Sequence, residues 1–96
     1  MTRDKPDANK RDLVKLWRSA GGLWIDQRRE AGFDGLALFR GRVWLVEIKD
    51  GRLPPSGQAL TPNELRQQAA VELRGVAYTI WRSVEDVVLA LESSPL

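Results

Sequence analysis

The 96-residue chain contains no cysteine and no histidine. Without thiols it forms neither a disulfide nor a thiolate metal site, and without imidazoles it lacks common zinc ligands and the commonest general base. Any metal ion must therefore be held by oxygen atoms, which favours a hard cation such as Mg²⁺ or Mn²⁺. No organic cofactor is expected.

Long apolar runs are also absent. No stretch approaches the ~20 residues that span a bilayer, and the charged N-terminus is not followed by the apolar core of a signal peptide. We therefore expect no membrane segment and a cytoplasmic location. With 43% hydrophobic and 29% charged residues, the chain is expected to be one small globular domain over 1–96. Residues 1–8 are predicted to be a flexible arm and 93–96 a frayed tail.

The small net charge is unevenly distributed. Residues 1–52 contain 12 Lys and Arg against 8 Asp and Glu, a net charge of +4, whereas residues 53–96 contain 3 against 5, a net charge of −2. The basic half would suit an anionic polymer whose phosphates approach bound metal. Taken alone, Lys5, Lys10, Arg11 and Lys15 are better explained as a solvated surface.

Apolar periodicity and turn signals predict the order α-β-β-β-α-β-α, which makes a mixed sheet between helices in a small α/β domain. Asn9 is expected to cap the first helix, and Thr61-Pro62-Asn63-Glu64 is a strong start for the helix that Gly75 closes. Ser83 is expected to cap the last helix. The apolar face of the first helix is predicted to be Leu13, Leu16, Trp17 and Ala20. Strands are predicted at 23–27, 36–39, 43–49 and 76–81, with a loop at 50–58.

The central stretch from Gly32 to Gly51 reads as a β-hairpin that contains three ionisable residues. Glu47 and Lys49 share one face of their strand because side chains alternate. A two-residue or four-residue turn around Arg40-Gly41 would place Asp34 directly opposite Glu47, whereas a three-residue turn would not. Two facing carboxylates destabilise a hairpin unless a cation lies between them. A divalent metal is the simplest such cation.

The Glu47-x-Lys49 triplet alone is weak evidence, since such a triplet occurs about once per 140 residues at average composition. A pair like this on one strand is most often a solvated salt bridge. The apolar neighbours, the facing Asp34 and a preceding helix that carries Asp12 favour a functional site. Asp12 also has a structural explanation, because a carboxylate in the first turn of a helix interacts favourably with the positive end of the helix dipole.

The arrangement of Gly32-Phe33-Asp34 followed by Glu47-Ile48-Lys49 resembles the PD-(D/E)xK nuclease superfamily, whose core is α-β-β-β-α-β. More narrowly, the chain resembles the stand-alone VRR-NUC domains of phages and bacteria. It departs from them at Phe33, where they commonly have proline, and after Thr61-Pro62, where they carry a Gln and a His. The matching motifs are Asn9-x-x-Asp12-Leu13-Val14, Phe39-Arg40-Gly41-Arg42, Glu47-x-Lys49-Asp50-Gly51, Pro54-Pro55-Ser56, Leu60-Thr61-Pro62 and Arg82-Ser83-Val84-Glu85-Asp86.

This resemblance implies a restriction-endonuclease-like fold and assigns roles to residues. Asp34 and Glu47 would bind Mg²⁺ or Mn²⁺ together with the backbone carbonyl of Ile48. Lys49 would orient the attacking water and offset charge on the phosphate. Asp12 matches the family's acidic residue on the first helix and would reach the metal directly or through water. Substrate contacts are predicted for Arg40, Arg42, Arg52, Ser56, Gln67 and Gln68.

The expected activity is that of a metal-dependent endonuclease acting on branched DNA, such as a Holliday junction, as a homodimer in a bacterial or phage-infected cell. Trp24 or Trp44 could line a dimer seam, although core packing explains them more simply. Two alternatives remain open from the residues alone. One is a non-catalytic nucleic-acid-binding or assembly module on a nuclease fold, and the other is a small scaffold whose charges form exposed salt bridges.

Overall fold

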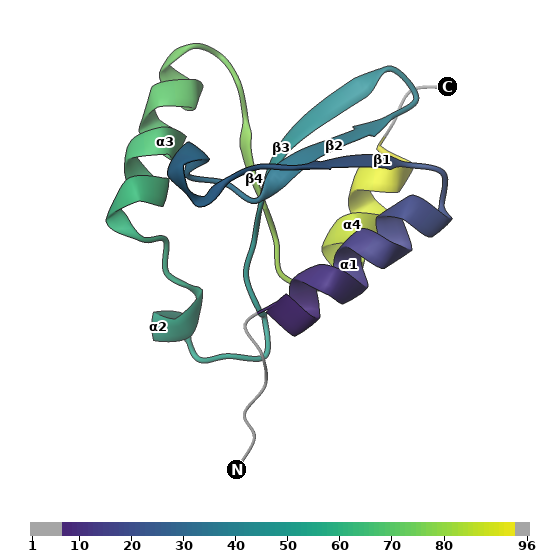
Figure 1. Cartoon of the computed structure of the whole chain (residues 1–96), viewed down its shortest axis with the longest axis horizontal. Coiled ribbons are helices and arrows are strands. Elements are labelled where there is room, and N and C mark those ends of the chain that lie inside the picture. Colours follow the sequence, from purple (N-terminus) through teal and green to yellow (C-terminus); the bar gives the residue numbers. More distant parts are fainter. Residues whose placement is uncertain (1–6, 94–96) are drawn as a thin grey trace.

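The computed structural model describes residues 7–93, in which a four-stranded sheet is flanked by helices on both faces (Figure 1). The predicted α/β class and the order of the main elements are confirmed. Two short elements were not predicted, a 3-10 turn before β2 and a single helical turn after β3. The elements are α1 (Asp7–Ser19), β1 (Leu23–Asp26), η1 (Arg29–Ala31), β2 (Gly35–Phe39), β3 (Arg42–Ile48), α2 (Pro55–Gln58), α3 (Pro62–Leu73), β4 (Tyr78–Trp81) and α4 (Val84–Glu92).

The sheet is mixed because its fourth strand arrives by a crossover. The strand order is β1-β2-β3-β4, with β1, β2 and β3 antiparallel and β4 parallel to β3. A parallel neighbour requires a crossover connection, and α3 supplies it. Helices α1 and α4 lie on one face of the sheet, and α3 lies on the other (Figure 1).

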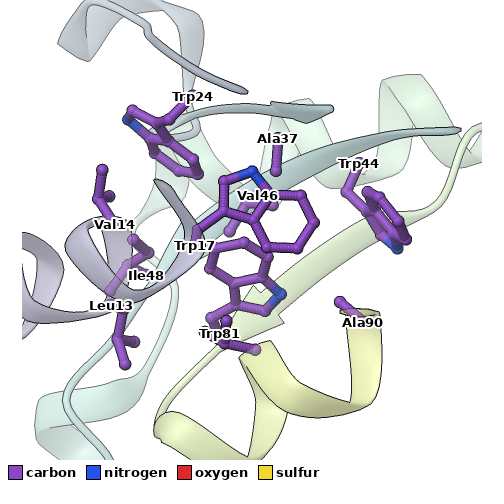
Figure 2. Close-up of a cluster of buried hydrophobic side chains, with 11 residues drawn as sticks. Leu13, Val14, Trp17, Trp24, Ala37, Trp44, Val46, Ile48, Trp81 and Ala90 are labelled. Carbon is purple, nitrogen blue, oxygen red and sulfur yellow. The ribbon is translucent and has the colours of Figure 1, made fainter. Parts of the chain in front are cut away.

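The core lies between the sheet and the α1–α4 pair. Trp44, Val46 and Ile48 alternate along β3 and point into it. Trp17 from α1 is fully buried at its centre, with its ring centroid 5.3 Å from that of Trp44 and 5.1 Å from that of Trp81 (Figure 2). All four tryptophans are buried, so neither Trp24 nor Trp44 lines a dimer seam.

For the first helix, the predicted cap is wrong and the predicted apolar face is right except at its last residue. Helix α1 begins at Asp7, so Asn9 lies inside it and is not its cap. The Asn9 amide instead donates a hydrogen bond of 2.8 Å to the carbonyl of Lys49. The buried stripe runs through Leu13, Val14 and Trp17, with Leu16 partly buried against it, whereas Ala20 is exposed. The predicted and the observed stripe both fit a helical repeat, and the packing partner decides between them.

The other boundaries differ by small amounts. Pro55 starts the single turn α2 within the segment predicted as a loop. Ser83 occupies the N-cap position of α4, but its side chain makes no capping hydrogen bond. The predicted arm and tail lie outside the described residues, except for the start of α1 and for Ser93 at the end of α4. Within residues 7–93, no helix is long and apolar enough to cross a membrane.

Candidate functional site

The hairpin turn has the even length that the site requires. Arg40 and Gly41 have φ values of 50° and 79°, and Phe39 pairs directly with Arg42. Positive φ at both central residues is typical of a two-residue turn whose twist matches the flanking strands. The turn thus meets the condition on which the predicted site depends, and the register continues without a slip to Gly35 opposite Val46.

Asp34 lies immediately before β2, where the regular ladder ends. Its backbone N–H donates to the Val46 carbonyl at 2.9 Å, one residue away from the expected pairing with Glu47. Its carboxylate Oδ2 accepts a hydrogen bond of 2.7 Å from the Ile48 N–H. This contact holds the Asp34 side chain along the edge of β3 that faces β2. Asp34 and Glu47 consequently line the same cavity, whose volume is about 850 Å³.

Glu47 is the buried charged residue of this region, with only 5% of its surface exposed. Burial, the charge of Asp34, and the hydrogen bond and charge of Glu64 together raise the pKa of Glu47 to about 8. A carboxyl group in this position is therefore largely protonated at neutral pH unless an added cation stabilises the carboxylate. Such an arrangement is typical of functional sites.

Lys49 lies between two carboxylates. Its Nζ is 3.5 Å from Glu47 Oε2 and 2.9 Å from Glu64 Oε1. Burial disfavours the ammonium, but the hydrogen bond and charge of Glu64, with those of Glu47, outweigh burial and raise the pKa of Lys49. Lys49 therefore remains a protonated donor at neutral pH.

Glu64 is a site residue that the sequence analysis did not identify as one. It is the third residue of α3 and forms the predicted capping box with Thr61. The Oε1 atom that accepts from Lys49 also accepts from the Thr61 N–H, at 2.9 Å. Burial disfavours its charge, but these hydrogen bonds lower the pKa of Glu64 overall. The capping motif was the available signal, since it fixes a carboxylate where α3 meets the sheet.

Helix α1 contributes Lys10 to the site rather than Asp12. The Lys10 Nζ lies 3.6 Å from Asp34 Oδ1 and 3.4 Å from Asp26 Oδ1. Lys10 is three residues before Leu13 and four before Val14, so it lies on the buried stripe. Asp12 is two residues further along, about 200° around the helix, and is exposed and outside the cavity lining. The structure therefore leaves Asp12 outside the cavity that Asp34 and Glu47 line.

The hairpin arginines also lie away from the site. Arg40 and Arg42 lie at the turn, at the opposite end of β2 from Asp34. The five residues of β2 separate them from Asp34 by roughly 17 Å, at about 3.4 Å per residue. The Arg40 guanidinium lies 5.1 Å from the Phe39 ring centroid, and that of Arg42 lies 4.9 Å from the Trp44 ring centroid. Their proximity to the motif in sequence does not bring them to it in space.

The remaining predicted substrate contacts are not brought into the cavity. Arg52 is exposed and forms an ion pair of 2.8 Å with Asp50, and Ser56 is exposed on α2. Gln67 and Gln68 are half-buried on α3. Gln67 packs so closely against Gly32 that a Cβ at Gly32 would lie 2.8 Å from its own. Gln67 thereby supports the loop before Asp34 instead of facing the cavity.

The chemistry of the donors fits a hard divalent ion. Residues 7–93 contain no group of three or more acidic residues placed to hold a metal. Mg²⁺ nevertheless commonly binds through one or two carboxylates and completes its shell with waters and substrate phosphate. Asp34 and Glu47, with the Ile48 carbonyl, would supply that kind of incomplete shell, and the burial of Glu47 makes a cation there favourable.

Comparison with known proteins gives one informative result. A solved structure described as "VRR_NUC domain" superposes on this chain with a TM-score of 0.65 and 25% sequence identity. The match covers 95% of this chain and 98% of that one. No family model matches the chain, and no curated protein matches it. The similarity extends over nearly the whole of both chains and confirms the expected restriction-endonuclease-like fold.

Proposed function

Because this chain is a VRR-NUC domain, a type of nuclease domain, we propose that it hydrolyses DNA phosphodiester bonds as a Mg²⁺- or Mn²⁺-dependent endonuclease. The observation that carries the proposal is the buried Glu47 beside Asp34 and Lys49 at the wall of an open cavity. Burying a carboxylate costs free energy that a purely structural residue would avoid. A bound cation would stabilise the buried carboxylate and would offset this cost.

The carboxylates of Asp34 and Glu47 and the carbonyl of Ile48 would hold the metal. When bound, the ion supplies positive charge that stabilises the negative charge developing on the phosphate. The Ile48 N–H fixes the orientation of the Asp34 carboxylate through its 2.7 Å hydrogen bond. The fixed orientation reduces the rearrangement needed on binding.

Lys49 would donate hydrogen bonds to the attacking water and to a phosphate oxygen. Its raised pKa keeps it protonated, so it acts as an electrostatic stabiliser and donor rather than as a general base. Glu64 would act on the reaction through Lys49, because it holds the ammonium at 2.9 Å beside Glu47. Glu64 is itself fixed by the start of α3.

We further propose that the substrate is branched DNA and that the nuclease works as a homodimer. One site per chain requires two copies to cut two strands at a junction. The sheet face that carries Glu47 also presents apolar residues, of which Leu23, Ile25 and Val43 are 55%, 42% and 58% exposed. A second copy would cover such a surface. Sedimentation should show a dimer that Val43→Lys converts to monomer, and a monomeric wild type would contradict this part.

The proposal is tested by incubating the protein with Mn²⁺ and labelled linear, flap, fork and four-way DNA. We expect cleavage of at least one branched substrate, with product lengths that report whether two strands are cut symmetrically. Omission of the metal should stop the reaction. Absence of cleavage on every substrate, at Mn²⁺ concentrations that saturate the site, would refute the nuclease.

A non-catalytic DNA-binding module is the second candidate. The ion pair between Lys10 and Asp34 favours it, since a cation of the chain already faces one of the carboxylates. Calorimetric titration with Mn²⁺ separates the two. A binding module has no reason to take up Mn²⁺ at Asp34 and Glu47, whereas the nuclease should bind it and lose the binding in Glu47→Gln.

A further inference from the structure

A second cavity, of about 380 Å³, runs along α1 outside the carboxylate pocket. Three of its lining residues, Arg11, Lys15 and Arg18, follow each other at intervals of four and three along the helix, so they form one exposed stripe. Val14 is buried beneath them. We call this cavity the α1 groove, and its lining is Lys10, Arg11, Val14, Lys15, Arg18 and Asp26.

The α1 groove adjoins the carboxylate pocket. Lys10 lines both cavities, and the consecutive residues Asp26 and Gln27 line one each. The groove's one acidic residue is already engaged, because Asp26 Oδ1 accepts a 2.6 Å hydrogen bond from Trp24 Nε1 and lies 3.4 Å from the Lys10 ammonium. The positive charge of the outer groove therefore comes from Arg11, Lys15 and Arg18, and Lys10, paired with Asp26 and Asp34, marks the border with the proposed catalytic pocket.

The length of the stripe matches a chain of phosphates better than a single anion. Arg11 and Arg18 are seven residues apart, which is about 10 Å along a helix. The phosphates of one DNA strand advance by about 3.4 Å along the duplex axis. The stripe can therefore contact successive phosphates, and arginine forks are well suited to phosphate oxygens. Val14 is the one apolar residue among those that line the groove, and it is buried.

We propose that the α1 groove binds the sugar-phosphate backbone of the DNA strand that continues into the carboxylate pocket. This inference rests on the proposed nuclease function for the identity of the polymer. Arg11, Lys15 and Arg18 hold the flanking phosphates, and Lys10 lies where the strand passes from the groove to Asp34 and Glu47. Arg40 and Arg42, at the hairpin tip, take no part.

The test compares two variants that each lose two positive charges. One is Lys15→Gln with Arg18→Gln in the α1 groove, and the other is Arg40→Gln with Arg42→Gln at the hairpin tip. Binding of a labelled four-way DNA is followed by fluorescence anisotropy in EDTA, between 50 and 200 mM salt. The groove variant should bind about 10-fold or more weakly, and the slope of log K against log salt should fall by about 2. The tip variant should change affinity by less than about 2-fold.

The single variant Lys15→Gln serves as a second measurement if the double variant fails to fold, and its slope should fall by about 1. Wild-type affinity and slope in the groove variants would overturn the inference. Equal weakening by the tip variant would also overturn it, because the effect would then be one of net charge. Failure of the wild type to bind DNA would overturn it as well.

A cleavage assay with Mn²⁺ separates this inference from the proposed function. If the wild type binds DNA through the groove but cuts none, the nuclease proposal is refuted and the proposed role of the groove in DNA binding is supported. If the wild type cuts DNA, and the groove variant binds and cuts equally well, the groove fails and the nuclease proposal stands.

Discussion

The two faces of strand β3 differ in how they use burial. On one face, Trp44, Val46 and Ile48 are packed under α1 and α4, where removal from water stabilises the fold. On the other, Glu47 is just as buried, but burial raises the free energy of its ionised form. Neighbouring residues of β3 thus differ in role: Val46 and Ile48 stabilise the core, and Glu47 belongs to the candidate site. Substitutions on the two faces should accordingly have effects of different kinds, and the following experiments probe that contrast.

The largest effect is expected from Trp17→Ala on the core side. Trp17 is fully buried and contacts aromatic rings from the sheet, so the substitution leaves a cavity that the surroundings cannot fill. We expect the free energy of unfolding to fall by about 3–5 kcal/mol, a large part of the stability of a small domain. Urea denaturation followed by circular dichroism measures it. Leu89→Ala, at a position 63% exposed on α4, should change it by less than about 0.5 kcal/mol. Equal losses in the two variants would contradict the assigned core.

Lys49→Ala should affect activity and spare the fold. Loss of the ammonium beside Glu47 removes charge stabilisation from the reaction, and we expect the cleavage rate to fall by about 100-fold to 1,000-fold. The far-ultraviolet spectrum and the affinity for DNA should change little. Arg66→Ala, on the exposed side of α3, is the control and should cut normally. Full nicking activity in Lys49→Ala would refute the mechanism.

Glu47→Gln should make the metal-free protein more stable at alkaline pH. The pKa of Glu47 in the folded protein is about 8 and exceeds its ordinary value of 4.5. Its contribution to stability is therefore complete below about pH 4.5 and is lost as the pH rises through 8. We expect the wild type to lose about 4 kcal/mol relative to Glu47→Gln between pH 5 and 9, since one pKa unit corresponds to about 1.4 kcal/mol. Denaturation curves across this range provide the measurement, with the exposed Glu72→Gln as control. If the two proteins lose stability equally as the pH rises, burial does not raise the pKa of Glu47.

The smallest effect is expected from Lys10→Gln. The Lys10 ammonium lies 3.6 Å from Asp34 and competes with any added cation for that carboxylate. Its removal should tighten Mn²⁺ binding by about 3-fold to 10-fold, which corresponds to the modest energy of a partly exposed ion pair. Lys15→Gln, with the same loss of charge on the same helix, should change the affinity by less than 2-fold. Weaker Mn²⁺ binding in Lys10→Gln would mean that the lysine supports the metal site instead of competing with it.

Local signals in the sequence were sufficient for much of the fold. The Arg40-Gly41 turn sets the register of its hairpin because both residues adopt positive φ, and a two-residue loop leaves one pairing. The start of α3 was predictable for the same reason, since Thr61 and Glu64 satisfy each other's backbone donors within one turn. Such features depend only on neighbours in the chain.

The errors concern contacts between distant segments. Leu13 and Trp17 belong to two overlapping helical stripes, and only the packing of α1 on the sheet selects the one that includes Lys10 and excludes Asp12. Arg42 is close to Glu47 along β3, yet the extended strand separates them. The pairing of Glu64 with Lys49 requires α3 to cross to the sheet face opposite α1, which no local pattern encodes.

One oxygen atom of Glu64 accepts hydrogen bonds from both the Thr61 N–H and the Lys49 ammonium. The residue that best starts α3 is thus also the residue that orients the lysine of the site. A replacement of Glu64 therefore has to begin a helix and also to leave Lys49 in place. Residues 61–64 accordingly belong with Lys49 in the proposed active site, and a graft of this domain should keep the first turn of α3 unchanged.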